Sequence, residues 1–444
     1  MISKSIQSCR EAIYRDLQQC RRGTFKLFAD IDCDTFCRLA HPDFSPVGWH
    51  LGHIAYTEDL WLLQRCALLK PVFPEYHQLF AADILPKKQR IFLPALPEVK
   101  LYLDAVRKKV LDYLEIAPIE EQERLWRFMI QHESQHCETV AFVLQMQKKE
   151  EGRRKKEEGR GKEEEGRRKE EEGRLIIDSR LPITDSRLPI PNYKLPIIDS
   201  PPIAIPGGEF YMGSDAAEAL DNERSRHLCY LEAYAIDRYP VTCGQYRDFM
   251  ASGGYQNPDW WSVEGWKWLK VHLVDRPLYW SENPAFNNHP VCGVSWYEAE
   301  AYCNFTGKRL PSEAEWEKAA SWDAANQTNR TYPWGEAPPN ASLCNHGNNL
   351  ANTSPVDAFP KGASATGCCD MLGNVWEWTA STFDAYPGFE SYPYKGYSQV
   401  YFDGEHRVLK GGSWATFPQA MRSSFRNWYY PGVRQIIAGF RCAK

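Results

Sequence analysis

Two histidines, His132 and His136, lie four residues apart in the stretch WRFMIQHESQHCETV. Residues at this spacing share one face of an α-helix, so both imidazoles can bind the same metal ion without strain. A third imidazole, His53, lies upstream in SPVGWHLGHIAYTEDLW, where apolar residues recur with helical spacing. The pattern predicts a three-histidine metal site made by two helices. Three imidazoles suit zinc, copper, nickel or iron, so these residues alone leave the metal open.

Other polar residues accompany these histidines. His50 lies three residues before His53 and shares its helix face, so it is an alternative ligand. Glu138, two residues after His136, is expected to orient a ligand imidazole rather than to bind the metal itself, and Glu133 is expected to face solvent. The ordinary alternative is that the histidines are structural residues of a helical bundle.

Helices must hold these imidazoles in place, and the first third of the chain predicts them. Apolar residues repeat at intervals of three and four in four segments, which are residues 11–31, the His53 segment, residues 96–116 and residues 120–147. Four helices of this length predict a four-helix bundle over residues 1–147, whose core is a common place for metal ligands from facing helices.

The composition changes abruptly after the bundle. Residues 148–174 contain only Lys, Arg, Glu and Gly, and a Pro-rich stretch follows. Residues 148–202 are therefore expected to be a solvated, partly helical or disordered spacer and an extended linker. Residues 203–444 have few helical patterns and many Gly, Pro, Asn and Trp residues, which predicts an α+β domain with much irregular structure. In this domain Ser312 and Glu315 are placed to form a capping box.

The whole chain bounds the possible functions. Its 444 residues are enough for two domains, and its net charge of -5 gives no general electrostatic case for binding nucleic acid. The charged N-terminus has no signal-peptide pattern, and no apolar run is long enough for a membrane span, so we expect a cytoplasmic protein that does not bind membranes. The 14 cysteines have no framework spacing and are expected to be reduced thiols.

Several motifs carry a family resemblance. In the C-terminal half these are IPGGEFYMGSD, YPVTCGQYRDFM, HPVCGVSWYEAEAYCNFTGKRLPSEAEWEKAA, YPWG, GNVWEWT, VLKGGSW and AGFRCA. Together they resemble the formylglycine-generating-enzyme/sulfatase-modifying-factor domain, which has a C-type-lectin-like fold. The N-terminal WHLGH and HxxQHxET motifs are similar to those of the DinB-like four-helix domain. The combination resembles the sulfoxide synthases of thiohistidine biosynthesis, in particular the hercynine-using enzymes of the ergothioneine pathway.

This resemblance implies a set of ligands and site residues. It implies a non-haem Fe(II) held by His53, His132 and His136, and as substrates hercynine (N-α-trimethylhistidine), O2 and either cysteine or γ-glutamylcysteine. Gln135 is expected to reach the bound hercynine. The segment FRNWYYPG is expected to hold the carboxylate and the trimethylammonium group of hercynine, since an amide suits a carboxylate and aromatic faces suit a cation. Its candidate residues are Asn427, Trp428 and Tyr429.

The family also implies a catalytic tyrosine near the iron. Five tyrosines lie in one variable loop, and we expect Tyr394 or Tyr397 to be the catalytic one, ahead of Tyr386, Tyr392 and Tyr401. A guanidinium group binds a carboxylate with two hydrogen bonds, so the sulfur donor is expected to meet an arginine. The candidates are Arg422, Arg426 and Arg434. We favour cysteine as the donor, because no further pair of charges is evident for a γ-glutamyl arm.

The chain departs from the formylglycine generators at their reactive site. Those enzymes use a copper-binding cysteine pair near the C-terminus, whereas here Cys442 is the only cysteine of that region. The GNVWEWT loop, which includes Gly373 and Asn374, is expected to be architectural, with a structural Ca²⁺ possible there by resemblance. The alternatives are a related ovothiol-type or selenium-donor synthase, a zinc-dependent thiol transferase, and a metal-free lectin-like binding protein.

Overall fold

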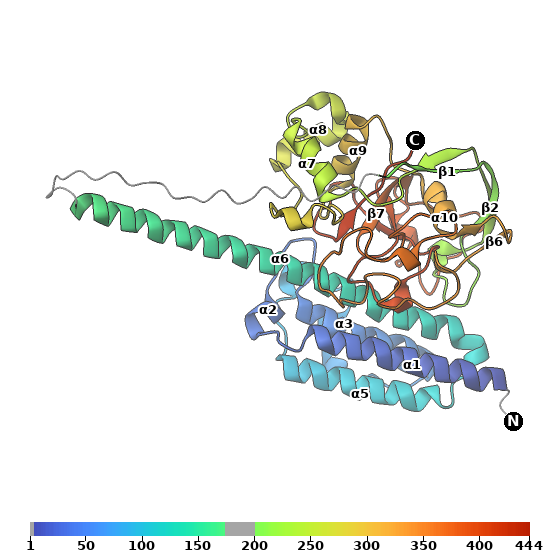
Figure 1. The fold of residues 1–444 in the computed structure, drawn as a ribbon. Helices are drawn as coiled ribbons and strands as arrows, with labels where there is room; N and C mark the ends of the chain where they lie inside the picture. Colours follow the sequence, from blue (N-terminus) through green and yellow to red (C-terminus); the bar gives the residue numbers. More distant parts are fainter. Residues whose placement is uncertain (1–3, 174–199) are drawn as a thin grey trace.

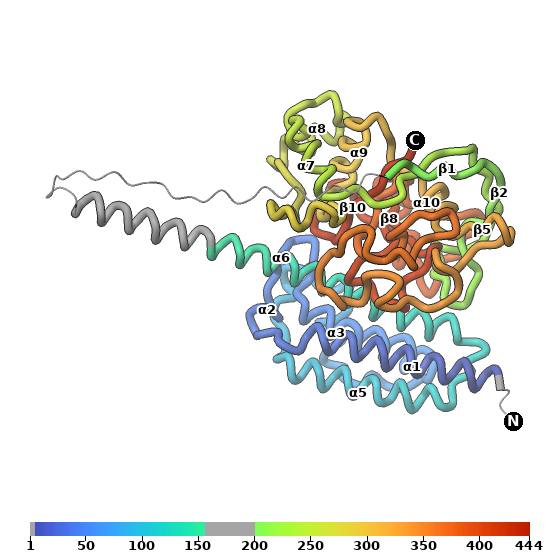
Figure 2. The backbone as a smooth tube through the Cα atoms, viewed as in Figure 1, coloured from blue at the N-terminus to red at the C-terminus, as the bar shows by residue number. Residues whose placement is uncertain are grey.

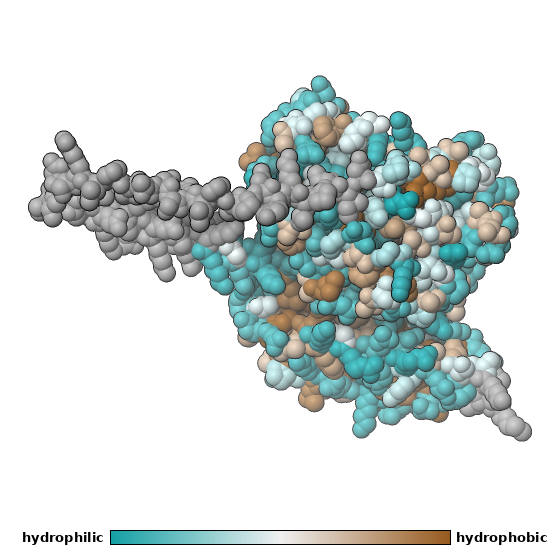
Figure 3. All heavy atoms as spheres, viewed as in Figure 1, coloured by the Kyte–Doolittle hydropathy of each residue, from teal (hydrophilic) through white to brown (hydrophobic). Residues whose placement is uncertain are grey.

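The computed structural model describes residues 4–173 and 200–444, with residues 156–173 described as backbone only. Residues 174–199 of the predicted spacer and linker therefore lie outside the described residues. The predicted architecture is confirmed: a helical N-terminal region is followed by a mixed α/β domain (Figure 1). None of the described helices combines the length and the apolar character needed to cross a bilayer. The face in Figure 3 is mainly hydrophilic, with only small hydrophobic patches.

The N-terminal bundle is built from four long helical segments. They are α1 (Lys4–Leu27), α3 (Val47–Glu58) with its π-helical continuation η1 (Asp59–Cys66), α5 (Leu96–Leu114) and α6 (Ile119–Gly173). Two short helices join them, α2 (Cys33–Cys37) and α4 (His77–Phe80). A Cβ atom at Gly52 would lie 2.1 Å from the ring of Phe80, so this glycine allows α4 to pack directly on α3.

Helix α6 extends beyond the predicted end of the bundle. It continues without interruption through residue 147, the predicted domain boundary, to Gly173. In Figure 1 it runs along the boundary between the bundle and the second domain and projects past both. The first part of the predicted spacer is therefore a continuation of the helix that carries His132 and His136.

The second domain has a small central sheet. Its strands lie in the order β10-β7-β8-β9, with β10 parallel to β7 and the other pairs antiparallel. Figure 2 labels β10 and β8 of this sheet. These strands are β7 (Trp376–Thr382), β8 (Arg407–Lys410), β9 (Asn427–Tyr429) and β10 (Ala438–Gly439). Three two-stranded sheets complete the described strands: β1 (Ile203–Ile205) with β4 (Tyr234–Ile236), β2 (Gly208–Met212) with β3 (His227–Leu231), and β5 (Trp322–Asp323) with β6 (Thr328–Asn329).

The helices of this domain begin where capping residues predict. They are α7 (Cys243–Ala251), α8 (Val263–His272), α9 (Trp296–Phe305) and α10 (Glu313–Ser321). The predicted capping box of α10 is confirmed, because the backbone N–H of Glu315 donates to Ser312 Oγ at 3.2 Å and that of Ser312 donates to Glu315 Oε2 at 2.7 Å.

The two domains share one hydrophobic core. A single cluster of buried side chains includes Met129 of α6 together with Trp414 and Phe417 of the second domain. A Cβ atom at Gly23 of α1 would lie 2.5 Å from the ring of Phe417, so the two domains approach each other closely there. This packing fixes α6 against both domains, and with it the two histidines that it carries.

Candidate metal centre

Three histidines from two helices meet in the interior. His53 on α3 and His132 and His136 on α6 each offer a ring nitrogen, and these three atoms lie within 4.8 Å of one another. The Nε2 atoms of His132 and His136 are 3.1 Å apart, as expected for residues one turn apart on one face. The structure thus brings together the three predicted ligands, although their binding of a metal remains a prediction.

Neighbouring groups orient the imidazoles for metal binding. The Nδ1–H group of His53 donates to the carbonyl oxygen of Phe80 at 2.6 Å, which leaves the lone pair on Nε2. His136 Nδ1 lies 2.8 Å from His50 Nδ1, and when His136 donates in this hydrogen bond its own Nε2 carries the lone pair. His50 is therefore a partner of a predicted ligand. This is the arrangement in which a second hydrogen bond fixes the tautomer of a metal-binding histidine.

Burial keeps these imidazoles neutral. It lowers the pKa of His53 to about 4. Burial, followed by the effect of neighbouring positive groups, lowers the pKa of His50 to about 3. The pKa values of His132 and His136 also fall well below the usual range, first through burial and then through the other histidines. Since a metal binds the neutral imidazole, the cluster is ready to accept an ion at neutral pH. The Nδ1 atom of His132 is buried without a partner among the described residues.

Glu133 faces the bundle core, so the expectation that it faces solvent was wrong. Its carboxylate is 1% exposed and accepts hydrogen bonds from Arg21 Nε at 2.8 Å and Arg107 Nη2 at 2.7 Å. Both arginines also pair with the buried carboxylate of Glu58. Burial alone would raise the pKa of Glu133, but the two guanidinium groups lower it, so the carboxylate stays ionised.

Gln135 and Tyr397 pair across the domain interface. The amide of Gln135 donates to Tyr397 Oη at 2.8 Å, and the phenol O–H is 3.1 Å from Gln135 Oε1. The ring of Tyr397 packs edge-on against Phe128, with 4.8 Å between ring centroids, and Phe128 stacks in turn with His132 at 6.2 Å. Burial raises the pKa of Tyr397, so the phenol keeps its proton. Of the two favoured tyrosines, this one is linked through side chains to the histidine cluster.

Tyr394 lies nearer the surface. Its side chain is 42% exposed and stacks on Trp61 of the bundle, with 5.6 Å between ring centroids. Its ring is 6.5 Å from that of Tyr397. The sequence could not separate these two tyrosines because they lie three residues apart in the same loop.

The predicted hercynine-binding segment forms β9, the edge strand of the central sheet. Trp428 stacks on Phe383 with 4.2 Å between ring centroids, and Tyr397 approaches it edge-on at 6.1 Å. Asn427 Oδ1 accepts from the backbone N–H of Trp428 at 2.9 Å. Trp428 thus packs between Phe383 and Tyr397, the tyrosine that pairs with Gln135. That Asn427, Trp428 and Tyr429 contact a substrate remains a prediction.

The three candidate arginines are held by buried glutamates. Arg422 pairs with Glu223 and also donates to Gln131 Oε1 at 2.8 Å. Arg426 Nε donates to Glu313 Oε1 at 2.7 Å, and Arg434 Nε lies 2.8 Å from Glu298 Oε2. These guanidinium groups already have carboxylate partners within the protein. Nothing in the contacts therefore supports their predicted role in binding the carboxylate of a sulfur donor.

Glu138 joins the two domains instead of orienting an imidazole, which corrects the expectation from the sequence. Its Oε1 atom accepts from Trp376 Nε1 at 2.8 Å, from Ser413 Oγ at 2.6 Å and from the hydroxyl group of Thr416. Burial raises the pKa of this carboxyl group, while the three hydrogen bonds oppose the rise. The donors lie far away in the sequence, so no local pattern could have identified them.

The GNVWEWT loop is an architectural hydrogen-bond centre. Asn374 Oδ1 accepts from the backbone N–H of Ser354 at 2.9 Å, and Asn374 Nδ2 donates to Asp370 Oδ2 at 2.7 Å. Gly373 has φ +86°, and a Cβ atom there would lie 2.3 Å from the backbone oxygen of Asn345. The predicted architectural role agrees with these contacts, and a structural Ca²⁺ in this loop stays a prediction.

Comparisons with known proteins cover both domains. Residues 200–444 match the family described as sulfatase-modifying factor enzyme 1-like domain, and residues 16–140 match the DinB superfamily. A protein of Mycolicibacterium smegmatis named hercynine oxygenase is 35% identical over 455 residues, which cover 98% of this chain and 99% of that protein. The hercynine oxygenase of Mycobacterium tuberculosis is 36% identical over 450 residues, covering 96% and 97% of the two chains.

A further relative matches only the second domain. The inactive C-alpha-formylglycine-generating enzyme 2 of Bos taurus is 30% identical over 282 residues, covering 54% of this chain and 87% of that protein. The two kinds of domain predicted from the motifs are thus both confirmed, and the proteins named above that match nearly the whole chain also contain both of them in one polypeptide.

Proposed function

The chain belongs to the family of hercynine oxygenases, and we propose that it is an Fe(II)- and O2-dependent sulfoxide synthase of ergothioneine biosynthesis. The substrates are hercynine, O2 and a thiol, either cysteine or γ-glutamylcysteine. A C–S bond forms at the imidazole ring in place of a C–H bond, and the sulfur is oxidised. One oxygen atom of O2 enters the sulfoxide, and the other leaves as water with the hydrogens of the ring C–H and the thiol S–H.

The observation that carries this proposal is the buried cluster of three neutral imidazoles beside the Gln135–Tyr397 pair. His53, His132 and His136 would hold the iron through nitrogens that no backbone group occupies. Three protein ligands leave positions open, and a bound Fe(II) supplies the redox chemistry that O2 requires. The all-nitrogen donor set and the hydrogen bonds to Phe80 and His50 fit such an ion.

Tyr397 is the residue we propose to donate a proton at this site. Its hydroxyl group is buried, keeps its proton at neutral pH and is held at 2.8 Å by the amide of Gln135. A phenol fixed in this way donates from Oη in a stable direction, which general acid catalysis needs. Gln135 therefore positions Tyr397. When hercynine is bound, the amide of Gln135 can instead rotate to form a hydrogen bond with the imidazole of the substrate.

The second domain supplies the proposed hercynine pocket. The faces of Trp428 and Tyr429 suit a trimethylammonium group through cation-π attraction, and the amide of Asn427 suits a carboxylate. Tyr397 beside this segment is buried, whereas Asn427, Trp428 and Tyr429 are half-buried and so are open to a ligand.

The first experiment tests the metal and the reaction together. We expect the full-length protein, purified without oxygen and supplied with Fe(II), to bind about one iron per chain. Oxygen uptake should then require both hercynine and a thiol, and mass spectrometry should detect the coupled sulfoxide. Comparison of cysteine with γ-glutamylcysteine identifies the donor. Zinc binding without oxygen uptake would support a thiol transferase instead, and absence of any metal would support a binding protein.

A pair of matched variants tests the tyrosine. Tyr397→Phe removes the buried hydroxyl and should lower kcat by about 100-fold or more, while KM for hercynine changes little. Tyr394→Phe, three residues away and partly exposed, should keep kcat within about twofold of the parent. Equal effects of the two changes would contradict the role proposed for Tyr397.

A further inference from the structure

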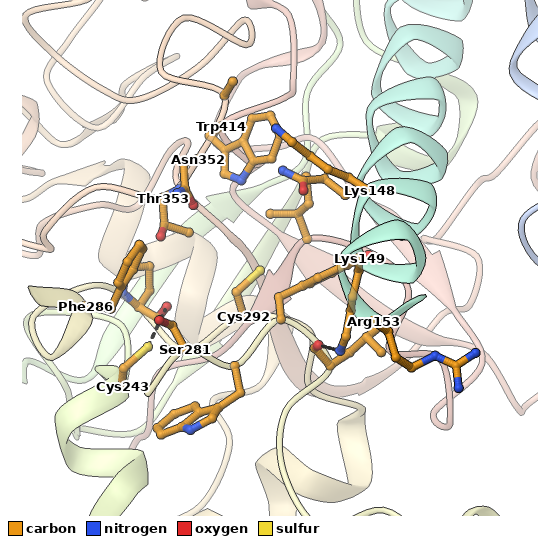
Figure 4. A pocket seen from close by; sticks show the side chains of 18 residues that line it. Lys148, Lys149, Arg153, Cys243, Ser281, Phe286, Cys292, Asn352, Thr353 and Trp414 are labelled. Carbon is orange, nitrogen blue, oxygen red and sulfur yellow. Dashed lines mark hydrogen bonds between the residues drawn. The ribbon is translucent and has the colours of Figure 1, made fainter. Parts of the chain in front are cut away.

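A second cavity lies between the extended part of α6 and the second domain. Its volume is about 580 Å³, and Figure 4 shows the side chains around it. Helix α6 contributes Gln145, Lys148, Lys149 and Arg153. Lys148 follows His136 by 12 residues, which corresponds to about 18 Å along a helix axis. The cavity is therefore separate from the histidine cluster.

The charged side chains that line this cavity in the described part of the chain are all basic. They are two lysines and one arginine, although the chain as a whole has a net charge of -5. The ammonium group of Lys149 donates to the carbonyl oxygen of Leu278, and neither Lys148 nor Lys149 forms an ion pair with any residue that the structure describes. Burial, and then the guanidinium groups of Arg434 and Arg276, lower the pKa of Lys149. An anion in the cavity would relieve this repulsion.

Aromatic side chains form another part of the wall. They are Tyr279, Trp280, Phe286 and Trp414. The indole N–H of Trp280 is buried and has no hydrogen-bond partner in the part of the chain that the structure describes. Asn352 and Thr353 add polar groups beside Phe286 (Figure 4). The combination offers aromatic faces for ring stacking together with positive charge, in a volume typical of small-molecule sites.

We propose that this cavity binds an anionic small molecule with a planar ring, the chemistry of a mononucleotide. The ring lies against the aromatic wall, and the phosphate meets the ammonium groups of Lys148 and Lys149. This site is independent of the proposed oxygenase reaction, because it contains none of the histidines and its test needs no turnover.

The test is a calorimetric titration of the full-length protein with AMP, adenosine and inorganic phosphate. AMP should bind with a Kd below about 1 mM, and adenosine and phosphate should each bind at least about tenfold more weakly, because each lacks one half of the recognised chemistry. The double variant Lys148→Glu/Lys149→Glu should weaken AMP binding by about tenfold or more. The matched control is Lys108→Glu/Lys109→Glu on α5, an adjacent exposed pair with the same change of charge, which should leave AMP binding unchanged.

A third variant tests the ring. Trp280→Leu should reduce AMP binding while leaving the weak phosphate binding as it was, since it removes only the stacking surface. The proposal is overturned if AMP does not bind. It is also overturned if AMP binds no better than phosphate, or if the control pair on α5 weakens binding as much as the pair on α6.

Discussion

Helix α6 contributes to two buried polar clusters that behave in opposite ways. Glu133 belongs to a group of two arginines and two glutamates whose charges cancel, and its remaining hydrogen bonds are made to Thr24 and to backbone carbonyls. His132, the residue before it, belongs to a group of imidazoles that pair with no carboxylate in the described part of the chain. The Arg–Glu cluster has both its charges balanced by residues of the protein, whereas the histidine cluster leaves ring nitrogens facing one another.

The difference separates a scaffold from a site. Buried ions persist only when they are paired, so the Arg–Glu cluster holds α1, α3, α5 and α6 in one arrangement. The histidines remain neutral, and the only charged group that would complete their cluster is a metal ion bound by the ring nitrogens that face one another. We therefore expect damage to the first cluster to lower stability, and damage to the second to remove metal binding and turnover.

The largest expected effect belongs to His132→Ala. This change removes one of three ligands and should abolish both iron binding and hercynine-dependent oxygen uptake, while the bundle stays folded. Iron is measured by elemental analysis, oxygen by electrode and folding by circular dichroism. The control is His77→Ala, an exposed histidine of the same domain, which should retain both activities. Full iron occupancy in the His132 variant would contradict the assignment of the cluster.

Arg107→Met tests the scaffold. Loss of the guanidinium group leaves Glu58 and Glu133 paired with Arg21 alone among the described residues, so the free energy of unfolding measured in urea should fall by about 3–5 kcal/mol. Arg154→Met is the control. Arg154 and Glu150 form an exposed ion pair within α6, which should contribute less than about 0.5 kcal/mol to the free energy of unfolding. Molecules of the Arg107 variant that remain folded should still bind iron. If Arg107→Met changed the iron affinity but not the free energy of unfolding, the Arg–Glu cluster would belong to the metal site and not to the scaffold.

The sequence predicts the histidine cluster better than the scaffold, for a physical reason. The spacing of His132 and His136 is local, and helical geometry alone places them together. The environment of Glu133 depends on Arg21 and Arg107, which are 112 and 26 residues away in the chain. A charged residue on an amphipathic helix is normally exposed, so nothing near Glu133 indicates its burial.

The same limit applies to residues at the domain interface. Helical periodicity and the family motifs predict both domains, but Glu138 meets its partners only when the domains pack together, and Arg422 has one distant partner in its own domain and one across the interface. Arg422 meets Glu223, which is 199 residues earlier, and Gln131, which is 291 residues earlier. Tyr397 was one of two equal candidates until its contact with Gln135, 262 residues away, distinguished it from Tyr394.

Glu138 provides an intermediate case between the two clusters, since it is a buried acid with no cation. Glu138→Ala leaves the donors of Trp376, Ser413 and Thr416 unpaired and should cost about 2 kcal/mol in urea denaturation. Glu138→Gln keeps an accepting oxygen and should cost less than about 1 kcal/mol. Equal losses for the two substitutions would show that the charge of Glu138, rather than its hydrogen bonds, holds the domains together.

The smallest effect is expected for the end of α6, residues 156–173, which lies beyond both clusters in the chain. Residues 156–173 consist only of Lys, Arg, Glu and Gly, so they have no apolar side chain to bury in either domain. Their deletion should change the free energy of unfolding by less than about 0.5 kcal/mol and leave iron binding and oxygen uptake intact. Residues 174–202 remain to connect the domains, and an extended chain spans about 3.3 Å per residue. Because Lys148 and Lys149 are retained, AMP binding should also persist. If turnover disappeared while iron binding survived, this part of α6 would contribute to the reaction in a way that neither polar cluster explains.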